Sequence, residues 1–228
     1  MWEERLRQLK KAYPEAIRFN PPITQAEVEN SEGHLGCKLD DVDPAWLQFL
    51  EMTNGARVLD YRFMPALVPP EYGIILATQI LRETNPWAMR KNYISFLSDT
   101  TGMDIGFVRT KSQTRCLAFL SESTEATALP IASSFTAFMI SFLEDVETVL
   151  NSWGDRSEES LILQGISDYW PLDLQTTLGR DPALRTMLES GKLDDLFRDD
   201  EEYSSIVDSA LRGTSQGLGK RKFPCDQS

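Results

Sequence analysis

A pair of carboxylates provides the first pattern in this sequence that could do chemistry. Asp99 and Asp104 lie on either side of the turn-forming pair Thr101-Gly102. Two carboxyl groups whose surroundings separate their pKa values can serve a hydrolase as general acid and general base. Aspartate beside a tight turn also has a purely conformational role, because its side chain bonds to nearby backbone groups. Two interpretations therefore stay open, a carboxylate-based hydrolase and an ordinary turn.

The other nucleophile and ligand patterns are sparse. The chain has one histidine, His34, which any Ser-His-Asp or Cys-His arrangement would have to use. Cys37 follows His34 beyond the helix-stopping Gly36, which is not a nucleophile–base geometry. Cys37, Cys116 and Cys225 are widely spaced and odd in number, which indicates neither a zinc site nor a disulfide framework. No phosphate-binding glycine motif occurs, so we expect no catalytic residue, no metal and no cofactor.

The charge of the chain points toward a protein partner. The sequence has 35 acidic and 23 basic side chains, a formal net charge of −12. Nucleic-acid binding depends on phosphate neutralisation by Lys and Arg, so the excess of acid opposes it, and it opposes anionic membranes too. It suits a basic protein partner through steering and complementarity. The same excess could instead serve solubility alone.

Acidic residues gather at two places along the chain. Three aspartates crowd the stretch 40–43, which could contact a basic partner, hold a cation or, for Asp43, cap a helix. Residues 194–202 carry six acids and one arginine, which indicates a solvated helix face or a surface that mimics phosphates. The candidate partner contacts are Asp40, Asp41, Asp60, Asp194, Asp195, Asp199, Asp200, Glu201 and Glu202.

Helix signals dominate the first 55 residues. Apolar spacing predicts a helix over about 2–12. Thr24 and Glu27 form a capping box for the next helix, which Gly36 ends in the left-handed region. Residues 38–42 are predicted as a loop. Asp43-Pro44 then begins a third helix, which Asn54-Gly55 ends.

The pattern changes to strands after residue 55. The stretches 58–64 and 72–77 are predicted as strands, followed by strands over 93–97, 105–109, 116–120 and 129–132. Their connections are too short for crossover helices, which predicts an antiparallel meander. A helix from Ser133 or Ser134 to about 150 buries Phe135, Phe138 and Phe142.

The chain is predicted to divide near residue 150. Residues 1–150 would form an independent α+β domain with a largely antiparallel sheet flanked by helices. Residues 151–228 would form an acidic helical extension, with a linker at 152–156, helices over 157–170 and from Asp181-Pro182 onward, and a tail that frays from Gly213. No signal peptide or sufficiently long apolar stretch is apparent, which predicts a soluble cytoplasmic protein without membrane partners.

The order of short motifs in residues 1–150 resembles the SUKH superfamily, the group of Syd, viral and yeast Knr-type domains. The motifs are Ile23-Thr24-Gln25-Ala26-Glu27-Val28, Leu35-Gly36, Leu39, Phe49-Leu50, Asn54-Gly55, Phe96-Leu97-Ser98-Asp99 and Ser134-Phe135-Thr136-Ala137-Phe138. The chain departs from the family pattern at Asp40, where proline is usual, and in a Leu39-to-Phe49 spacing about two residues longer.

This resemblance implies a non-enzymatic protein-binding domain. Its most frequent role in the family is an immunity protein that neutralises a protein toxin, often a nuclease, and such a partner would be basic. Yeast members instead regulate client proteins, so a regulatory scaffold of the same fold is an alternative. The carboxylate-based hydrolase is the alternative from a different class.

Overall fold

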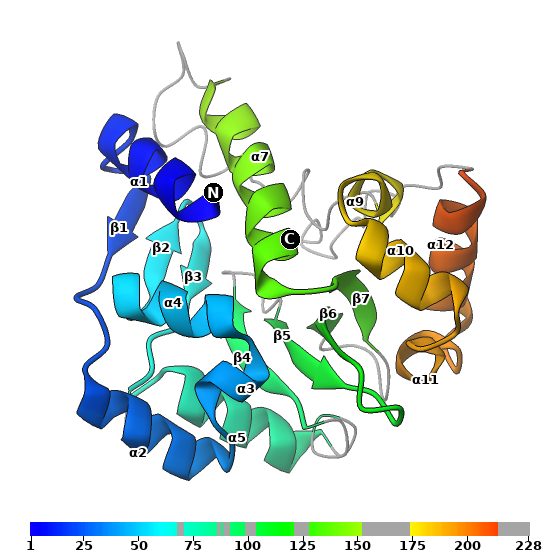
Figure 1. Cartoon of the computed structure of the whole chain (residues 1–228), viewed down its shortest axis with the longest axis horizontal. Helices are drawn as coiled ribbons and strands as arrows, with labels where there is room; N and C mark the ends of the chain where they lie inside the picture. Colours follow the sequence, from blue (N-terminus) through cyan, green and yellow to red (C-terminus); the bar gives the residue numbers. More distant parts are fainter. Residues whose placement is uncertain are drawn as a thin grey trace, which may run out of the picture.

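The computed structural model describes residues 1–67, 71–85, 88, 92–98, 104–120, 128–151 and 174–213. In this part of the chain a seven-stranded antiparallel sheet packs with helices, and further helices follow toward the C-terminus (Figure 1). The sheet order is β1-β2-β3-β4-β5-β6-β7, so neighbouring strands are also consecutive in the chain. The predicted α+β class with an antiparallel meander is confirmed.

The strands are β1 Ile17–Phe19, β2 Ala56–Val58, β3 Tyr61–Phe63, β4 Ile94–Ser98, β5 Asp104–Arg109, β6 Arg115–Leu120 and β7 Leu129–Ala132. The helices up to residue 151 are α1 Trp2–Ala12, α2 Gln25–Leu35, α3 Leu39–Val42, α4 Pro44–Met52, α5 Ile74–Thr84 and α7 Phe135–Asn151. The C-terminal helices are α9 Leu174–Arg180, α10 Pro182–Glu189, α11 Asp194–Phe197 and α12 Glu201–Arg212. No helix of the described ranges is long and apolar enough to cross a membrane.

The predicted helix ends are present where local side chains determine them. Thr24 and Glu27 form the capping box of α2, and Gly36 ends this helix with a left-handed φ of 72°. Asp43 caps α4 at the backbone N–H of Ala45, 2.9 Å away, with Pro44 in the first turn. These caps satisfy backbone N–H groups that have no partner inside the helix.

Three predicted elements were wrong. Residues 58–64 are not one strand but parts of β2 and β3, which turn at Leu59, whose φ is 56°. Residues 72–77 are not a strand, because Ile74 begins the helix α5. A short continuous apolar run fits a buried helix as well as a strand, so the sequence pattern did not separate them. The expected loop over 38–42 contains α3, and β1 was not predicted.

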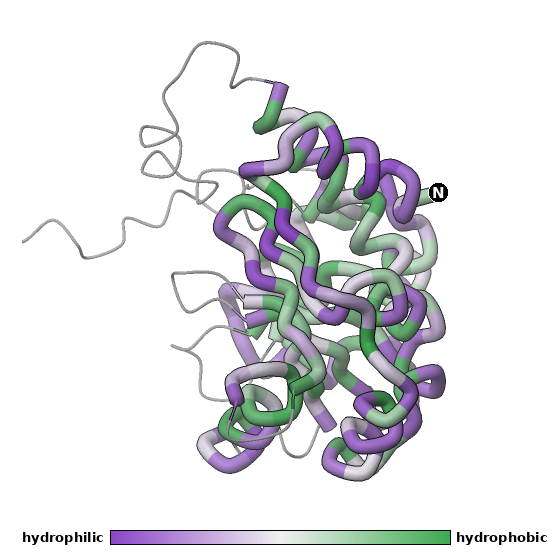
Figure 2. Tube along the Cα trace, turned by 90° about the vertical axis from the view of Figure 1, so that its left-hand side faces the viewer, coloured by the Kyte–Doolittle hydropathy of each residue, from purple (hydrophilic) through white to green (hydrophobic). Residues whose placement is uncertain are grey.

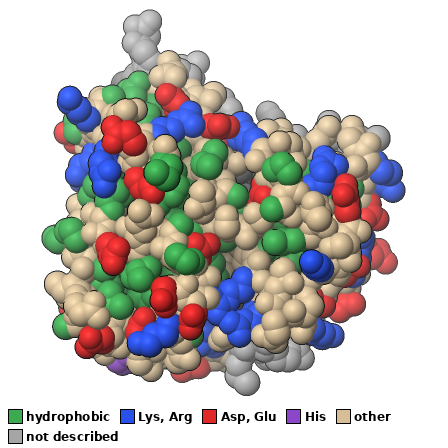
Figure 3. All heavy atoms as spheres, viewed as in Figure 1, with side chains coloured by type: hydrophobic (Ala, Val, Ile, Leu, Met, Phe, Trp, Pro, Cys, Tyr) green, Lys and Arg blue, Asp and Glu red, His purple; other side chains and the backbone are tan. Residues whose placement is uncertain are grey.

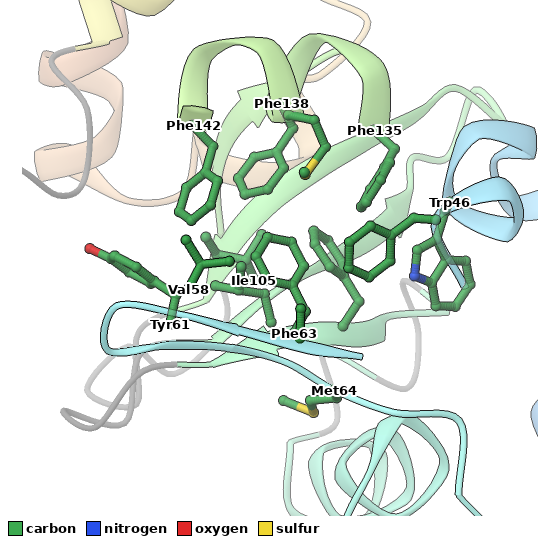
Figure 4. Packing of buried hydrophobic residues seen from close by; sticks show 14 of the residues in the cluster. Trp46, Val58, Tyr61, Phe63, Met64, Ile105, Phe135, Phe138 and Phe142 are labelled. Carbon is green, nitrogen blue, oxygen red and sulfur yellow. The ribbon is translucent and has the colours of Figure 1, made fainter. Parts of the chain in front are cut away.

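The sheet separates two hydrophobic cores. The first, the large core, packs α1, α4 and α7 against one face and includes the aromatic rings of Phe63, Phe96, Phe135 and Phe138. Figure 4 shows Phe63 facing Phe135 and Phe138 of α7. Phe96 alone lies within 5.0–5.6 Å, centroid to centroid, of the rings of Phe107, Phe135 and Phe138. Such aromatic pairs contribute beyond their buried area. Five apolar residues of the short sequence motifs are all buried: Leu35, Phe49, Leu50, Phe96 and Phe138.

The second core, the extension core, lies between the sheet and the C-terminal helices. It joins Val108, Cys116 and Ala118 of the central hairpin to apolar residues of α9–α12, including Leu184 and Phe197. Side chains alternate between the faces of a strand, so the β5–β6 hairpin lines both cores. Figure 2 shows hydrophobic and hydrophilic residues interspersed along the chain. The described part of the extension is therefore helical, as predicted, and it packs against the sheet; the stretch 157–170 and the tail beyond Gly213 lie outside the described residues.

Polar links hold the extension to the sheet and α7. The Asp181 carboxylate, which is buried, caps α10 at Leu184 N and also accepts hydrogen bonds from Ser133, just before α7. Arg180 pairs with Glu144 and Asp145 of α7, each at 3.0 Å. Whether residues 1–150 fold independently stays a prediction.

Candidate functional site

The candidate contacts Asp40 and Asp41 lie on the exposed side of α3. This short helix is held against the end of α2, because Glu32 pairs with Lys38 and accepts a hydrogen bond from Leu39 N at 3.1 Å. Leu39 and Val42 are buried, which turns both aspartates outward. Asp43 has a different role, since its two carboxylate oxygens accept from Ala45 N and from Phe135 N.

Asp60 lies in the turn between β2 and β3. It is half-buried, and its carboxylate is 3.8 Å from the guanidinium of Arg57 in the preceding strand. Its charge is therefore largely compensated within the hairpin, which weakens its case as a contact for a basic partner.

The acidic stretch 194–202 divides into structural and outward-facing residues. Asp194 pairs with Arg198 at 3.4 Å, and Asp195 accepts a hydrogen bond from the Lys111 backbone at 2.9 Å. Asp200 caps α12 at the backbone N–H of Tyr203, 2.9 Å away.

The outward-facing residues of this stretch are Asp199, Glu201 and Glu202, and all three are exposed. We call these three residues the acidic end of α12. Arg198 beside them is held by Asp208 at 2.8 Å, and hydrogen bonding to that carboxylate raises the pKa of Arg198. The nearby positive charge is therefore already paired.

The candidate contacts lie in three separate places. Figure 1 shows α3 low in the centre of the molecule, the β2–β3 hairpin on the left, and α11 and α12 at the right-hand edge. Acidic side chains gather along this right-hand edge in Figure 3. A partner that binds the acidic end of α12 through one continuous surface would therefore not contact Asp60 as well.

Those residues considered for catalysis that the structure describes do not form a catalytic arrangement with one another. His34 is exposed, and its Nδ1 lies 2.9 Å from the carbonyl oxygen of Asn30. Burial raises the pKa of the Cys37 thiol. Asp104 accepts hydrogen bonds of 2.6 Å from the hydroxyls of Tyr93 and Ser95. Asp99, the other carboxylate of the hydrolase hypothesis, lies outside the described residues.

The described residues do not bring metal ligands together. No group of three or more His, Cys, Asp or Glu side chains in those ranges could hold a metal ion. The three aspartates at 40–43, all of them described, therefore do not form such a group.

Sequence reasoning missed a cluster of arginines at one end of the sheet. Arg109 ends β5 and Arg115 begins β6, directly opposite in the strand register. Arg82 of α5 bonds to the backbone of Tyr93 at the start of β4, the neighbouring strand. A signal was present, since Arg109 ends the predicted strand 105–109 and Arg115 directly precedes the predicted strand 116–120.

Comparison with known proteins gives no family assignment. No protein-family model matches the chain, and no curated protein matches it.

Proposed function

We propose that this chain is a protein-binding module of the SUKH type that neutralises a basic protein toxin. The observation that carries the proposal is the acidic end of α12. Asp199, Glu201 and Glu202 are exposed, while the one arginine within the stretch is paired by Asp194 and Asp208. The start of this helix therefore presents three exposed carboxylates on a chain of net charge −12. Such a surface attracts a basic partner and speeds its association.

The placement of the short motifs supports the SUKH part of the proposal. The Thr24–Glu27 motif begins α2 and Leu35-Gly36 ends it. Phe96 of β4 packs against Phe135 and Phe138 at the start of α7, so two motifs far apart in sequence meet in the large core. The motifs thus belong to the same folding unit, as a shared domain would require.

The first experiment identifies the partner and its consequence. The full chain is used as bait in the native lysate, and the captured protein is then expressed in cells with and without this chain. Rescue of growth supports an immunity role. A captured protein that is harmless when expressed alone would favour the regulatory scaffold instead.

The second experiment tests the acidic end of α12. The triple variant D199N/E201Q/E202Q should lower the association rate by about tenfold at low salt, with less effect on dissociation. The difference should shrink as salt rises, because the Debye length falls from about 10 Å at 0.1 M to about 3 Å at 1 M.

A matched control removes the same number of charges elsewhere on the surface. Glu4, Glu29 and Glu51 are exposed on α1, α2 and α4, so E4Q/E29Q/E51Q gives the same net charge. Equal slowing by the two triple variants would mean that net charge alone steers the partner. That result would remove the acidic end of α12 from the interface.

A further inference from the structure

The β5–β6 hairpin places two arginines side by side on one face of the sheet. Arg109 and Arg115 are register partners, and each is half-buried. Like charges directly opposite one another on neighbouring strands repel and destabilise a sheet. Phe107 and Leu117, the next pair with the same orientation, line the large core. The arginines therefore sit at the rim of this core, toward the side of α3.

Their hydrogen-bonding capacity is largely unused. Arg109 donates one hydrogen bond, from Nη1 to Gln113 Oε1 at 3.2 Å. Arg109 Nε and Arg115 Nη1 are shielded from solvent and donate to no acceptor in the described part of the chain. Buried donors without acceptors are rare in folded proteins, and each calls for an explanation such as an ion.

The nearby carboxylates do not neutralise this pair. Asp41 and Asp43 are close enough to act on Arg115 electrostatically, yet neither forms an ion pair with it. Both oxygens of Asp43 are taken by the backbone N–H groups of Ala45 and Phe135. Within the described ranges, Arg109 and Arg115 have no carboxylate within 4.0 Å.

A third guanidinium lies at the same end of the sheet as the first two. Arg82 donates from Nε to the carbonyl oxygen of Tyr93 and from Nη2 to Asn92 Oδ1, both at 2.9 Å. These bonds fix it at the start of β4, the end of the sheet where β5 stops and β6 begins. Figure 3 shows Lys and Arg side chains close together in the lower middle of the molecule, near α3.

Cys37 lies near the three arginines. Burial raises the pKa of its thiol, while Arg115, Arg82 and Arg109 each act to lower it. The thiol of one residue thus lies within the electrostatic field of all three guanidinium groups. Like the three arginines, Cys37 is half-buried, so a small ion can reach the cluster from solvent.

We infer that Arg82, Arg109 and Arg115 form a binding site for a doubly charged oxyanion of the phosphate class. Guanidinium groups present paired N–H donors that match the oxygens of phosphate, and several oxygens can be bound at once. A dianion offsets most of the cluster's charge, whereas a single carboxylate offsets less. The site is independent of the acidic end of α12 and of the toxin proposal.

The test uses the full chain and inorganic phosphate. Calorimetric titration should detect binding to the wild-type protein, and its melting temperature should rise with phosphate but not with chloride of equal ionic strength. Glycerol phosphate should act similarly if the site takes phosphate monoesters, and acetate should have little effect. Acetate that binds as well as phosphate, or phosphate that does not bind, would overturn the inference.

The double variant R109M/R115M should lose the phosphate response. Without phosphate it should melt no lower than wild type, because the repulsion between the two guanidinium groups is gone. A purely structural role predicts the opposite pattern, a lower melting temperature with the phosphate response retained. R115K keeps the charge and should bind about tenfold more weakly, since lysine lacks the paired donors.

The chain offers a matched control pair. Arg57 and Arg62 are register partners on the β2–β3 hairpin, which β4 separates from the β5–β6 hairpin. Their donors have acceptors, since Arg57 bonds to Leu59 O and pairs with Asp60, and Arg62 bonds to Tyr72 O. R57M/R62M should therefore keep the full phosphate response, and its loss there would overturn the assignment to Arg109 and Arg115.

A second readout needs no change to the arginines. In a C225S background, iodoacetamide should modify Cys37 and spare the buried Cys116, whose pKa is raised by burial. Bound phosphate cancels the field that favours the Cys37 thiolate, so modification should slow by several-fold as phosphate is added. A rate that depends on ionic strength alone would count against a bound anion.

Discussion

Asp181 and Ser133 are joined by two hydrogen bonds. The Asp181 carboxylate accepts from the Ser133 backbone N–H at 2.7 Å and from its hydroxyl at 2.8 Å. The same carboxylate accepts from Leu184 N at 2.9 Å and so begins α10. One buried side chain therefore both starts a helix of the extension and attaches it to the turn before α7.

Replacing Asp181 should destabilise the protein more than removing an ordinary helix cap. D181A leaves the half-buried donors of Ser133 unsatisfied as well as uncapping α10, which should lower the free energy of unfolding by about 2–4 kcal/mol. The cap of α12 provides the comparison, and D200A should cost about 1 kcal/mol. Urea unfolding followed by circular dichroism measures both. Equal losses would show that the link to Ser133 contributes little.

The two faces of the sheet predict what removal of the extension does. A chain that ends at Asn151 exposes Val108, Cys116 and Ala118, which the extension core now covers. We expect this shortened chain to keep its α+β circular dichroism spectrum, to melt at a lower temperature and to bind a dye specific for apolar surface. Melting at the wild-type temperature without dye binding would mean that residues 1–150 are stable by themselves.

Gly106 should not tolerate a side chain. A Cβ at this position would lie 2.5 Å from the carbonyl oxygen of Ile94 and 2.5 Å from the ring of Tyr93. Backbone of the neighbouring strand cannot move away cheaply, so G106A should cost about 3 kcal/mol.

Gly33 is the matched case, because nothing lies within 4 Å of a Cβ there and the residue is inside α2. G33A should raise the free energy of unfolding by about 0.5–1 kcal/mol, since alanine favours the helix. Thermal melting of both variants gives the answer, and similar shifts in one direction would contradict the packing argument.

The capping box of α2 should give a pH-dependent contribution. The Glu27 carboxylate accepts from the Thr24 N–H at 2.7 Å and from its hydroxyl at 2.8 Å, and these bonds, the backbone bond foremost, lower the pKa of Glu27. A lowered folded-state pKa means that the contribution is complete above the ordinary glutamate pKa. It is lost as the pH falls through the lowered value.

The variant E27Q should therefore be less stable than wild type near about pH 7, by less than about 1 kcal/mol because the pair is exposed and screened. This difference should narrow toward about pH 3, as the wild-type carboxyl is protonated. Denaturant titrations over this range measure it. E29Q, on the exposed side of the same helix, should show little change with pH.

The parts of this fold that sequence predicted are those set by neighbouring residues. Thr24, Glu27 and Gly36 determine the ends of α2 locally, and the four strands from Ile94 to Ala132 follow from β-type runs between close turns. The strand predicted over 72–77 was wrong because a buried apolar run has no periodicity that separates helix from strand. β1 has three residues and forms through pairing with β2, which no local signal announces.

The candidate site shows the same division. The exposure of Asp40 and Asp41 follows from the burial of Leu39 and Val42 on one short helix. The structural use of Asp195 could not be predicted, because its partner Lys111 is 84 residues away. The arginine cluster likewise depends on the β5–β6 register, which side-chain types alone do not give.

Both hydrophobic cores include residues of the β5–β6 hairpin, so the fold is sensitive to the register of these two strands. Phe107 and Leu117 point into the large core, while Val108 and Cys116 point into the extension core. A slip of one residue would send each set to the opposite side. The large side chains would then overpack the extension core, where the hairpin now contributes small residues. The small residues would leave cavities among the phenylalanines of the large core. A register shift would thus disrupt packing on both faces of the sheet. An inserted residue within either strand should therefore lower the stability of the fold far more than one in the turn at 111–114.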